Sequence, residues 1–218
     1  MENILCIVTG TSRGVGHELK NILKNADLEL ICLNRTIQDE HDHKLDLSHT
    51  ENVMVSFYNL QRKIEDKYPN HKIIFVNNAS VIEPIGKIGM LKARQITDCI
   101  NTCISSPLLL LNFLGSLNNR FAIINITSGA AHTINKHLGV YSSSKMFMET
   151  YLKFVNIEDN NCFKVVDYNP GVAETEMYHS LKNNILFKNE KFDGIIPKRA
   201  SDVAEEINEI IRNIINND

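Results

Sequence analysis

The chain has 218 residues, of which 43% are apolar and 22% are charged, and its formal net charge is −3. This composition is typical of a soluble globular protein and excludes a disordered or low-complexity chain. Lys and Arg number 23 against 26 Asp and Glu, and no dense basic run occurs, so the charge pattern excludes a nucleic-acid partner.

At about 150 residues per domain, the length predicts a single domain over residues 1–218. The N-terminal residues lack the basic start and cleavage site of a signal peptide, and no apolar run approaches the roughly 18 residues of a membrane span. The five cysteines include no C-x-x-C pair, which favours reduced thiols over disulfides or zinc. We therefore expect a cytoplasmic protein with no membrane contact. No metal site is expected either, since His41 and His43 share a short polar loop without a third ligand.

Short apolar runs alternate with helical patterns along the chain. The runs, which predict strands buried on both faces, are Ile4–Thr9, Leu28–Leu33, Lys44–Leu47, Ile73–Asn77, Phe121–Thr127 and Phe163–Tyr168. The helical patterns are Val15–Ala26, Ser48–Tyr68, Lys92–Leu117, Ser142–Ile157 and Ser201–Ile215. The alternation predicts an α/β fold with a doubly wound parallel sheet and helices on both faces, a three-layer Rossmann-type architecture.

Two local features refine this expectation. Ser48 and Glu51 have the spacing of a capping box, which predicts the start of the second helix. Only about nine residues separate Arg35 from Leu45, too few for an ordinary crossover helix, so the second and third strands should be joined by a short loop or a single turn.

A glycine-rich segment, TGTSRGVG from Thr9 to Gly16, follows the first strand and leads into the first helix. Glycines allow the backbone to turn tightly and to approach a pyrophosphate closely, and a helix N-terminus attracts that anion. In this strand, turn and helix context the segment predicts a dinucleotide-binding site.

The spacing of Gly10, Gly14 and Gly16 resembles the T-G-x-x-x-G-x-G motif of the short-chain dehydrogenase/reductase family, and further motifs follow in order. They are Asn77-Asn78-Ala79-Ser80, which departs from N-N-A-G at its last residue, Ser128, Tyr141 with Lys145 as Y-x-x-x-K, and Asn169-Pro170-Gly171 followed by Thr175. The chain is identified as a member of this family from about Ile4 to Met177. Its segment Tyr168–Met177 looks most like the branch that contains sepiapterin and benzil reductases. The family's usual seventh strand is expected to be missing, because the chain stops after its last helix.

The resemblance implies a catalytic group of Ser128, Tyr141 and Lys145. Tyr141 and Lys145 are four residues apart and therefore share one helix face, so the ammonium can approach the phenol. Tyr141 would then exchange a proton with the substrate oxygen, and Ser128 would hold that oxygen by a hydrogen bond.

A fourth catalytic position belongs to an asparagine in the helix before the fifth strand. Asn101 is the direct candidate. The family often has a proline four residues after that asparagine, and aligning Pro107 places Cys103 at the position instead. Both registers remain open, although we prefer the proline register.

Cofactor choice is expected at the end of the second strand. An acid there would bind the ribose 2′-hydroxyl, whereas this chain has Asn34 and Arg35, and Arg13 lies in the glycine turn. Two guanidinium groups suit a 2′-phosphate, so NADP(H) is favoured over NAD(H). Asp46 matches an adenine contact, with a helix-capping acid as the alternative. The residues expected against the cofactor are Gly10, Ser12, Arg13, Gly14, Val15, Gly16, Asn34, Arg35, Asp46, Leu47, Asn78, Ala79, Tyr141, Lys145, Pro170, Gly171, Val172 and Thr175.

Together these features predict an NADPH-dependent oxidoreductase that reduces a ketone, diketone or aldehyde of a small molecule. The alternative is a weakly active or inactive NADP(H)-binding sensor or scaffold of the same fold. A homodimer is also expected, because the helices before and after the fifth strand carry more apolar surface than one sheet face requires. The apolar residues concerned are Leu108–Leu111, Met146, Phe147, Met148, Tyr151 and Phe154.

Overall fold

The computed structural model describes residues 3–158, 161–187 and 194–217. Its centre is a six-stranded sheet in the order β3-β2-β1-β4-β5-β6, in which all paired strands are parallel. The strands are β1 (Ile4–Thr9), β2 (Glu29–Asn34), β3 (Asp42–Lys44), β4 (Lys72–Asn77), β5 (Phe121–Ile126) and β6 (Cys162–Tyr168). The predicted doubly wound parallel sheet is confirmed.

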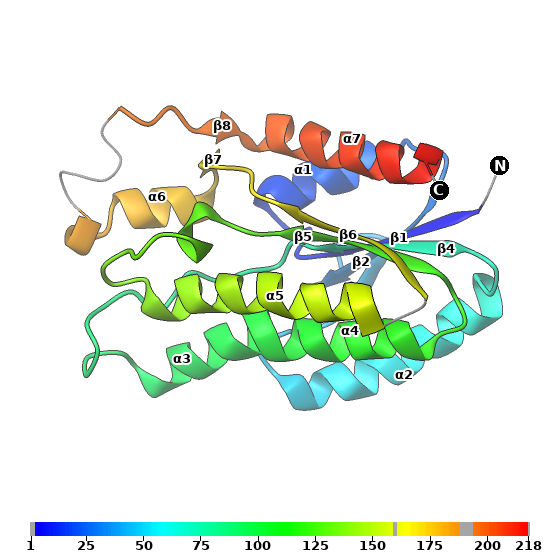
Figure 1. Ribbon diagram of the computed structural model, residues 1–218, viewed down its shortest axis with the longest axis horizontal. Helices are drawn as coiled ribbons and strands as arrows, with labels where there is room; N and C mark the ends of the chain where they lie inside the picture. The colour runs from blue at the N-terminus through cyan, green and yellow to red at the C-terminus, as the bar shows by residue number, and fades with distance from the viewer. Residues whose placement is uncertain (1–2, 159–160, 188–193, 218) are drawn as a thin grey trace.

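Helices form a layer on each side of the sheet, as Figure 1 shows. One layer contains α1 (Gly14–Leu23) and α7 (Ala200–Asn217). The other contains α2 (Thr50–Lys67), α3 (Ala93–Ile100), α4 (Ser106–Ser116) and α5 (Gly139–Glu158). A short helix, α6 (Glu176–Lys182), and a two-stranded pair of β7 (Ala173–Glu174) and β8 (Lys198–Arg199) lie beyond the carboxyl ends of the strands (Figure 1).

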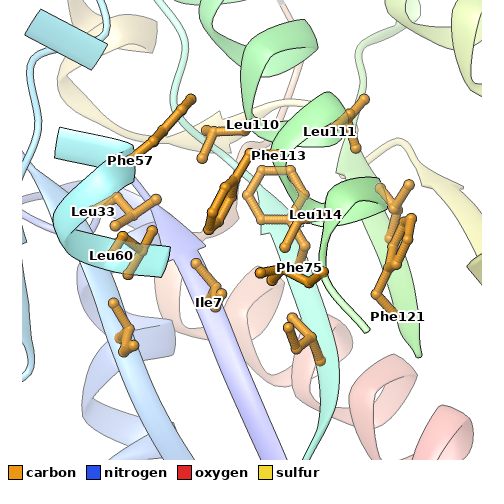
Figure 2. Close-up of a cluster of buried hydrophobic side chains, with 14 of the residues drawn as sticks. Ile7, Leu33, Phe57, Leu60, Phe75, Leu110, Leu111, Phe113, Leu114 and Phe121 are labelled. Carbon is orange, nitrogen blue, oxygen red and sulfur yellow. The ribbon is translucent and has the colours of Figure 1, made fainter. Parts of the chain in front are cut away.

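The central strands are mostly apolar because both of their faces are covered. Successive side chains point to opposite faces, so Ile7 and Phe75 meet the α2 and α4 layer (Figure 2). There Phe57 of α2 stacks on Phe113 of α4, with ring centroids 5.3 Å apart. The alternate positions of the strands pack with α1 and α7 in a second cluster, to which Leu19 belongs. The two layers fix the sheet whose carboxyl edge carries the site.

The third strand differs from the prediction Lys44–Leu47. It covers Asp42–Lys44, and Leu45 and Leu47 are buried in the loop that follows. The amide of Leu45 still donates to the carbonyl of Asn34, at 2.6 Å, so the chain continues along β2 after the strand ends. The apolar pattern identified the buried residues correctly, but it predicted a strand that begins two residues after the observed one. The expected short connection between β2 and β3 is confirmed.

The predicted capping box at Ser48 is wrong. Helix α2 begins at Thr50, and His49 is its N-cap residue without a side-chain capping bond. The Ser48 hydroxyl instead donates to Oδ1 of Asp46 at 2.7 Å, and the Ser48 amide donates to the same oxygen at 3.0 Å. The Asp46 carboxylate therefore binds the Ser48 side chain, which is then not available to cap the helix.

The predicted helix Lys92–Leu117 exists but is not a regular α-helix. Between α3 and α4 the residues Asn101–Ser105 form a π-helical turn, the kind of insertion that often occurs at functional sites. The stretch Ala93–Ser116 is long and apolar enough to cross a membrane, with a mean hydropathy of 1.3 over an 18-residue window. Half of that window is buried inside the fold, and the core helix of a protein without a membrane span passes the same test.

A row of polar side chains crosses three strands on the α2, α4 and α5 side of the sheet. Asn77, Asn125 and Asp167 are paired in register on β4, β5 and β6. The Asn77 amide donates to Oδ1 of Asn125 at 2.9 Å, and the Asn125 amide donates to Oδ1 of Asp167 at 2.7 Å. Each of the three strands thus carries one hydrogen-bonded polar side chain at or next to its carboxyl end.

Candidate active site

A cleft of about 630 Å³ opens at the carboxyl ends of the strands. It lies where the chain turns from β1 outward to β2 and returns at β4, the switch point at which parallel sheets bind ligands. Lining it are Ser128 and all the residues expected against the cofactor, namely Gly10, Ser12, Arg13, Gly14, Val15, Gly16, Asn34, Arg35, Asp46, Leu47, Asn78, Ala79, Tyr141, Lys145, Pro170, Gly171, Val172 and Thr175. The sequence motifs, far apart in the chain, therefore meet in one cleft.

The glycine turn is fixed by close backbone contacts. Gly10 has φ of +72° and Gly14 has φ of +58°, conformations that favour glycine. A Cβ atom at Gly10 would lie 2.9 Å from Cα of Ala79, and one at Gly16 would lie 2.3 Å from the Gly10 carbonyl oxygen. The side chain of Asn78 donates to the carbonyls of Thr9 and Gly10, at 2.9 and 3.0 Å. The β4 loop thus ties the turn in place.

The first turn of α1 points its free amides into the cleft. The N-cap residue Arg13 makes no side-chain capping bond, and the first helical bond runs from the His17 amide to the Arg13 carbonyl. Gly14, Val15 and Gly16 line the cleft. Uncapped amides at a helix N-terminus bind anions, so this turn fits the pyrophosphate of a nicotinamide dinucleotide.

Ser128, Tyr141 and Lys145 lie together on one wall of the cleft. Tyr141 and Lys145 project from α5, are each 7% exposed, and place the ammonium 5.8 Å from the phenol ring centroid. Lys145 is held by a 2.8 Å hydrogen bond to the Ile126 carbonyl at the end of β5. Ser128 Oγ accepts from the Ala130 amide at 3.2 Å, which leaves its hydroxyl proton free to donate into the cleft.

The two candidates for the fourth position lie on different sides of the helix, and neither of them is among the residues that line the cleft. Asn101 donates to the Ser48 carbonyl at 2.8 Å. Cys103 is 4% exposed, and its sulfur lies 3.4 Å from the hydroxyl of Ser80, which does line the cleft. Both registers stay open as predictions, and the proline register remains the preferred one.

The adenine end of the cleft has no acid at the end of β2. Asn34 is 2% exposed, and both polar atoms of its side chain already have partners. Its oxygen accepts from the backbone amide of Thr11 at 2.7 Å, and its nitrogen donates to Oδ1 of Asp42 at 2.7 Å. Arg35, the next residue, is exposed at the edge of the cleft. For Asp46, burial raises the pKa, but hydrogen bonds from Ser48 lower it by more, so the carboxylate is charged.

Two charged contacts at this end were not foreseen. Glu176, at the start of α6, forms an ion pair with Arg13 across the cleft. The buried Lys20 of α1, 1% exposed, pairs with Asp42 at 2.7 Å and with Asp39 at 3.0 Å. Both contacts join residues far apart in the chain, and no local pattern around any of them marks the pairing.

The opposite end of the cleft, beside Tyr141, is apolar. A small cluster of buried side chains surrounds the phenol there: Ile82 and Leu138 are 7% and 4% exposed, and Ile85, Ala130, Met177 and Leu181 pack against them. These residues lie in loops and in α6, outside the periodic runs, so the sequence pattern did not identify them. Over the described ranges, no group of three His, Cys, Asp or Glu side chains is arranged to hold a metal ion.

Comparison with known proteins agrees with this geometry. The family described as short chain dehydrogenase matches residues 5–185. Benzil reductase ((S)-benzoin forming) of Bacillus subtilis is 27% identical over 193 residues, which cover 83% of this chain and 79% of the relative. Sepiapterin reductase of Xenopus laevis is 26% identical over 202 residues, covering 81% and 76%. The expected branch of the family is therefore confirmed.

Solved structures agree in fold. The alcohol dehydrogenase of the archaeon Thermococcus sibiricus, complexed with 5-hydroxy-NADP, superposes with a TM-score of 0.77 at 18% identity. The match covers 97% of this chain and 91% of that one. The family match over residues 5–185 and the clustered motifs lead to one conclusion: the chain belongs to the short-chain dehydrogenase family and is an oxidoreductase that acts on CH–OH and carbonyl groups.

Proposed function

We propose that this enzyme reduces the carbonyl of a small apolar ketone, diketone or aldehyde with NADPH. The observation that carries the proposal is the polarity of the cleft. One end has Arg13, Arg35 and no acid at the end of β2, and the other surrounds Tyr141 with apolar side chains. An anionic cofactor at the first end would bring its reactive ring toward an apolar substrate at the second.

The chain's own residues supply the proton chemistry. When bound, the nicotinamide dinucleotide supplies the hydride. Ser128 donates a hydrogen bond to the substrate oxygen and holds it beside the phenol of Tyr141, which gives that oxygen its proton. The ammonium of Lys145, fixed on the Ile126 carbonyl, stabilises the negative charge left on the phenol.

The preference for NADPH rests on charge at the adenine end. A ribose 2′-phosphate needs cationic partners, and Arg13 and Arg35 are both exposed at the cleft. An acid at the Asn34 position would repel such a phosphate, whereas the amide there is neutral and turned inward. NAD(H) is the second candidate.

An apolar substrate is favoured by the lining beside Tyr141. Ile82, Leu138 and Met177 offer no charge to a substrate, so burial of apolar surface would supply most of its binding free energy. The relative named for benzil and (S)-benzoin is matched over 83% of this chain. An aryl diketone is therefore the first substrate to test.

We also propose a homodimer in the cytoplasm. The outer face of α5 exposes a patch of Met146 (53%), Phe147 (42%), Phe154 (54%) and Ile157 (79%), called here the α5 patch. Apolar residues gathered on one helix face are typical of an interface. The five cysteines are free thiols, which supports a reducing compartment.

The proposal is tested by fluorescence titration of the purified protein with NADPH and, in parallel, with NADH. We expect saturable binding of both and tighter binding of NADPH, followed by consumption of NADPH on addition of benzil. Equal or tighter binding of NADH would overturn the cofactor choice. If NADPH binds and no apolar ketone, diketone or aldehyde is reduced, the substrate class is wrong.

A further inference from the structure

Cys99 and Cys103 form a buried pair of thiols next to the π-helical turn. They are 0% and 4% exposed, and both sulfur atoms lie 3.7 Å from the Val81 carbonyl oxygen. The Cys103 sulfur is also 3.4 Å from the hydroxyl of Ser80. Both thiols are within hydrogen-bonding reach of this one carbonyl, and each shifts the pKa of the other, so the two sulfurs are close neighbours.

The pair lies directly behind the wall of the cleft. Ser80 and Val81, which contact the sulfurs, both line the cleft, as does Thr102 between the two cysteines. The positive charge of Lys145 acts to lower the pKa of both thiols. A single layer of residues, which includes Ser80, therefore separates Cys103 from a small molecule in the cleft.

The two thiols differ in acidity. The side-chain contact with Cys99 is the main cause that lowers the pKa of Cys103; burial opposes it, and Lys145 and Ser80 add to the lowering. The same contact, together with burial, raises the pKa of Cys99. Cys103 is therefore the more acidic thiol of the pair, and the thiolate is the form that reacts with oxidants.

A second pair in the same chain provides the contrast. Cys6 and Cys32 are buried on the neighbouring strands β1 and β2 and also influence each other. Burial raises the pKa of Cys6 strongly, and that of Cys32 to about 11. Both thiols therefore stay protonated, so this pair should be inert.

We propose that Cys99 and Cys103 are an oxidisable dithiol behind the active-site wall, which a peroxide converts into a disulfide. The Cys103 thiolate attacks one peroxide oxygen, the O–O bond breaks, and the hydroxide that leaves takes a proton to become water. Cys103 is thereby oxidised to a sulfenic acid. The Cys99 sulfur then attacks the Cys103 sulfur, the S–O bond breaks, and the departing hydroxide takes the Cys99 proton as a second water.

The disulfide would alter the cleft. Cβ atoms four residues apart on a helix are about 5–6 Å apart, whereas a disulfide holds them at about 3.8 Å. The turn that carries Thr102 must therefore tighten, and the negative charge near Lys145 is lost. Oxidation should lower turnover, and reduction should restore it.

The test is chemical and requires no substrate, so it is independent of the proposed reductase activity. The purified protein is treated with a small excess of hydrogen peroxide, the remaining thiols are alkylated, and the products are mapped by mass spectrometry. We expect two of the five thiols to be lost, as a Cys99–Cys103 disulfide that dithiothreitol reverses. Occupation of the cleft by NADPH should slow the reaction.

Variants separate the two roles. Cys99→Ser should stop the reaction at a sulfenic acid on Cys103, which dimedone traps, and Cys103→Ser should leave Cys99 reduced. Cys162→Ser is the matched control, because Cys162 is the most exposed of the five thiols at 8%, and its loss should change nothing. If Cys162, Cys6 or Cys32 of the wild-type protein is oxidised first, or if no thiol is lost, the proposal is wrong.

Discussion

At the scale of single residues, the proposed reaction divides one proton transfer among three side chains. Ser128 accepts from the Ala130 amide, so its own proton can be donated to a substrate, while Lys145 is fixed by the Ile126 carbonyl. In this proposal Tyr141 is the group that gives up the proton. Each of the two neighbours is held by the backbone near the end of β5, so a single strand end positions both.

Tyr141→Phe should lower turnover by about 10²- to 10⁴-fold, because the ring remains and only the transferable proton is removed. Binding of NADPH should persist, since the glycine turn is untouched. Steady-state kinetics and fluorescence titration measure the two effects. Tyr151→Phe is the matched control: Tyr151 is on the same helix, stacks on Phe147 and does not belong to the cleft wall described above. Equal activity of both variants would remove Tyr141 from the mechanism.

Glu176→Gln should tighten NADPH binding by up to about fivefold, since an exposed ion pair contributes at most ~1 kcal/mol. In the structure the Glu176 carboxylate occupies Arg13, and a 2′-phosphate would have to compete with it. NADH binding should change less, because it has no such phosphate. Both affinities are measured by titration.

Glu174→Gln is the control for that experiment. Glu174 is a neighbouring exposed carboxylate that lies 4.0 Å from His179 rather than beside Arg13. A similar gain in NADPH affinity in both variants would point to overall charge instead of release of Arg13.

The sequence identified well the residues that line the cleft, because most of them belong to short motifs at strand ends. The choice between Asn101 and Cys103 stays open because two registers fit the same helix, and only the fold shows that the Asn101 amide is bonded to Ser48. The ion pair of Glu176 was not predicted, because its partner, Arg13, is 163 positions away and no local sequence pattern indicates the contact.

At the scale of elements, a buried charge network joins α1 to the loop between β2 and β3. Lys20 of α1 reaches Asp42 at the start of β3, and Asp42 also accepts from the amide of Asn34 at the end of β2. Asn34 in turn holds Thr11 next to the glycine turn. The network therefore supports the segment on which Arg35 lies.

Lys20→Met should destabilise the protein by about 3–5 kcal/mol, because it leaves the buried Asp42 carboxylate without its counter-charge. The free energy of unfolding is measured by urea denaturation. The double variant Lys20→Met/Asp42→Asn should recover much of the loss, since the asparagine oxygen still accepts hydrogen bonds and carries no charge. If the double variant is as unstable as the sum of the single ones, charge pairing is not the cause.

The same network predicts loss of stability in acid. Burial raises the pKa of Asp42, but hydrogen bonds from Lys20, Gln38 and Asn34 lower it by more; for Asp39, bonds from Lys24 and Lys20 likewise outweigh burial. Both carboxyl groups thus have a pKa below the unfolded value of about 3.9. Their contribution is complete above that pH and is lost as the pH falls through their folded values.

Urea midpoints should therefore decrease below about pH 4, and less steeply in Lys20→Met/Asp42→Asn, where Asp42 no longer titrates and Asp39 has lost one cation. Identical pH dependence of the double variant and the wild-type protein would contradict this assignment.

Elements were predictable where the apolar pattern was long. The strands β1, β2, β4, β5 and β6 were located within one residue, because buried parallel strands are continuous apolar runs, whereas the short β7 and β8 were not predicted. Strand β3 was misplaced because its own residues, Asp42–Lys44, are polar, while the buried Leu45 lies beyond it. The capping box failed since Asp46 binds Ser48, and the π-helical turn has no distinct composition.

At the scale of the whole molecule, the α5 patch predicts a dimer that substitution should dissociate. Phe154→Lys should shift the protein to monomer in sedimentation velocity, because it places a charge among Phe147, Met146 and Ile157. Val55→Lys is the control, because Val55 is an even more exposed apolar residue (69% against 54% for Phe154) on the outer face of α2. A wild-type protein that sediments only as a monomer would contradict the dimer.

The polar row of Asn77, Asn125 and Asp167 has a consequence for folding. Parallel strands of nearly uniform Ile, Val and Phe could pair in several alignments with similar burial of apolar surface. A shift of β5 by one residue would turn Asn125 toward the layer that holds Ala122 and Ile124, and an unpaired buried amide costs about 1–3 kcal/mol. The true alignment is the one in which all three side chains meet. The row therefore favours the native register over sheets in which these polar side chains would be buried without partners.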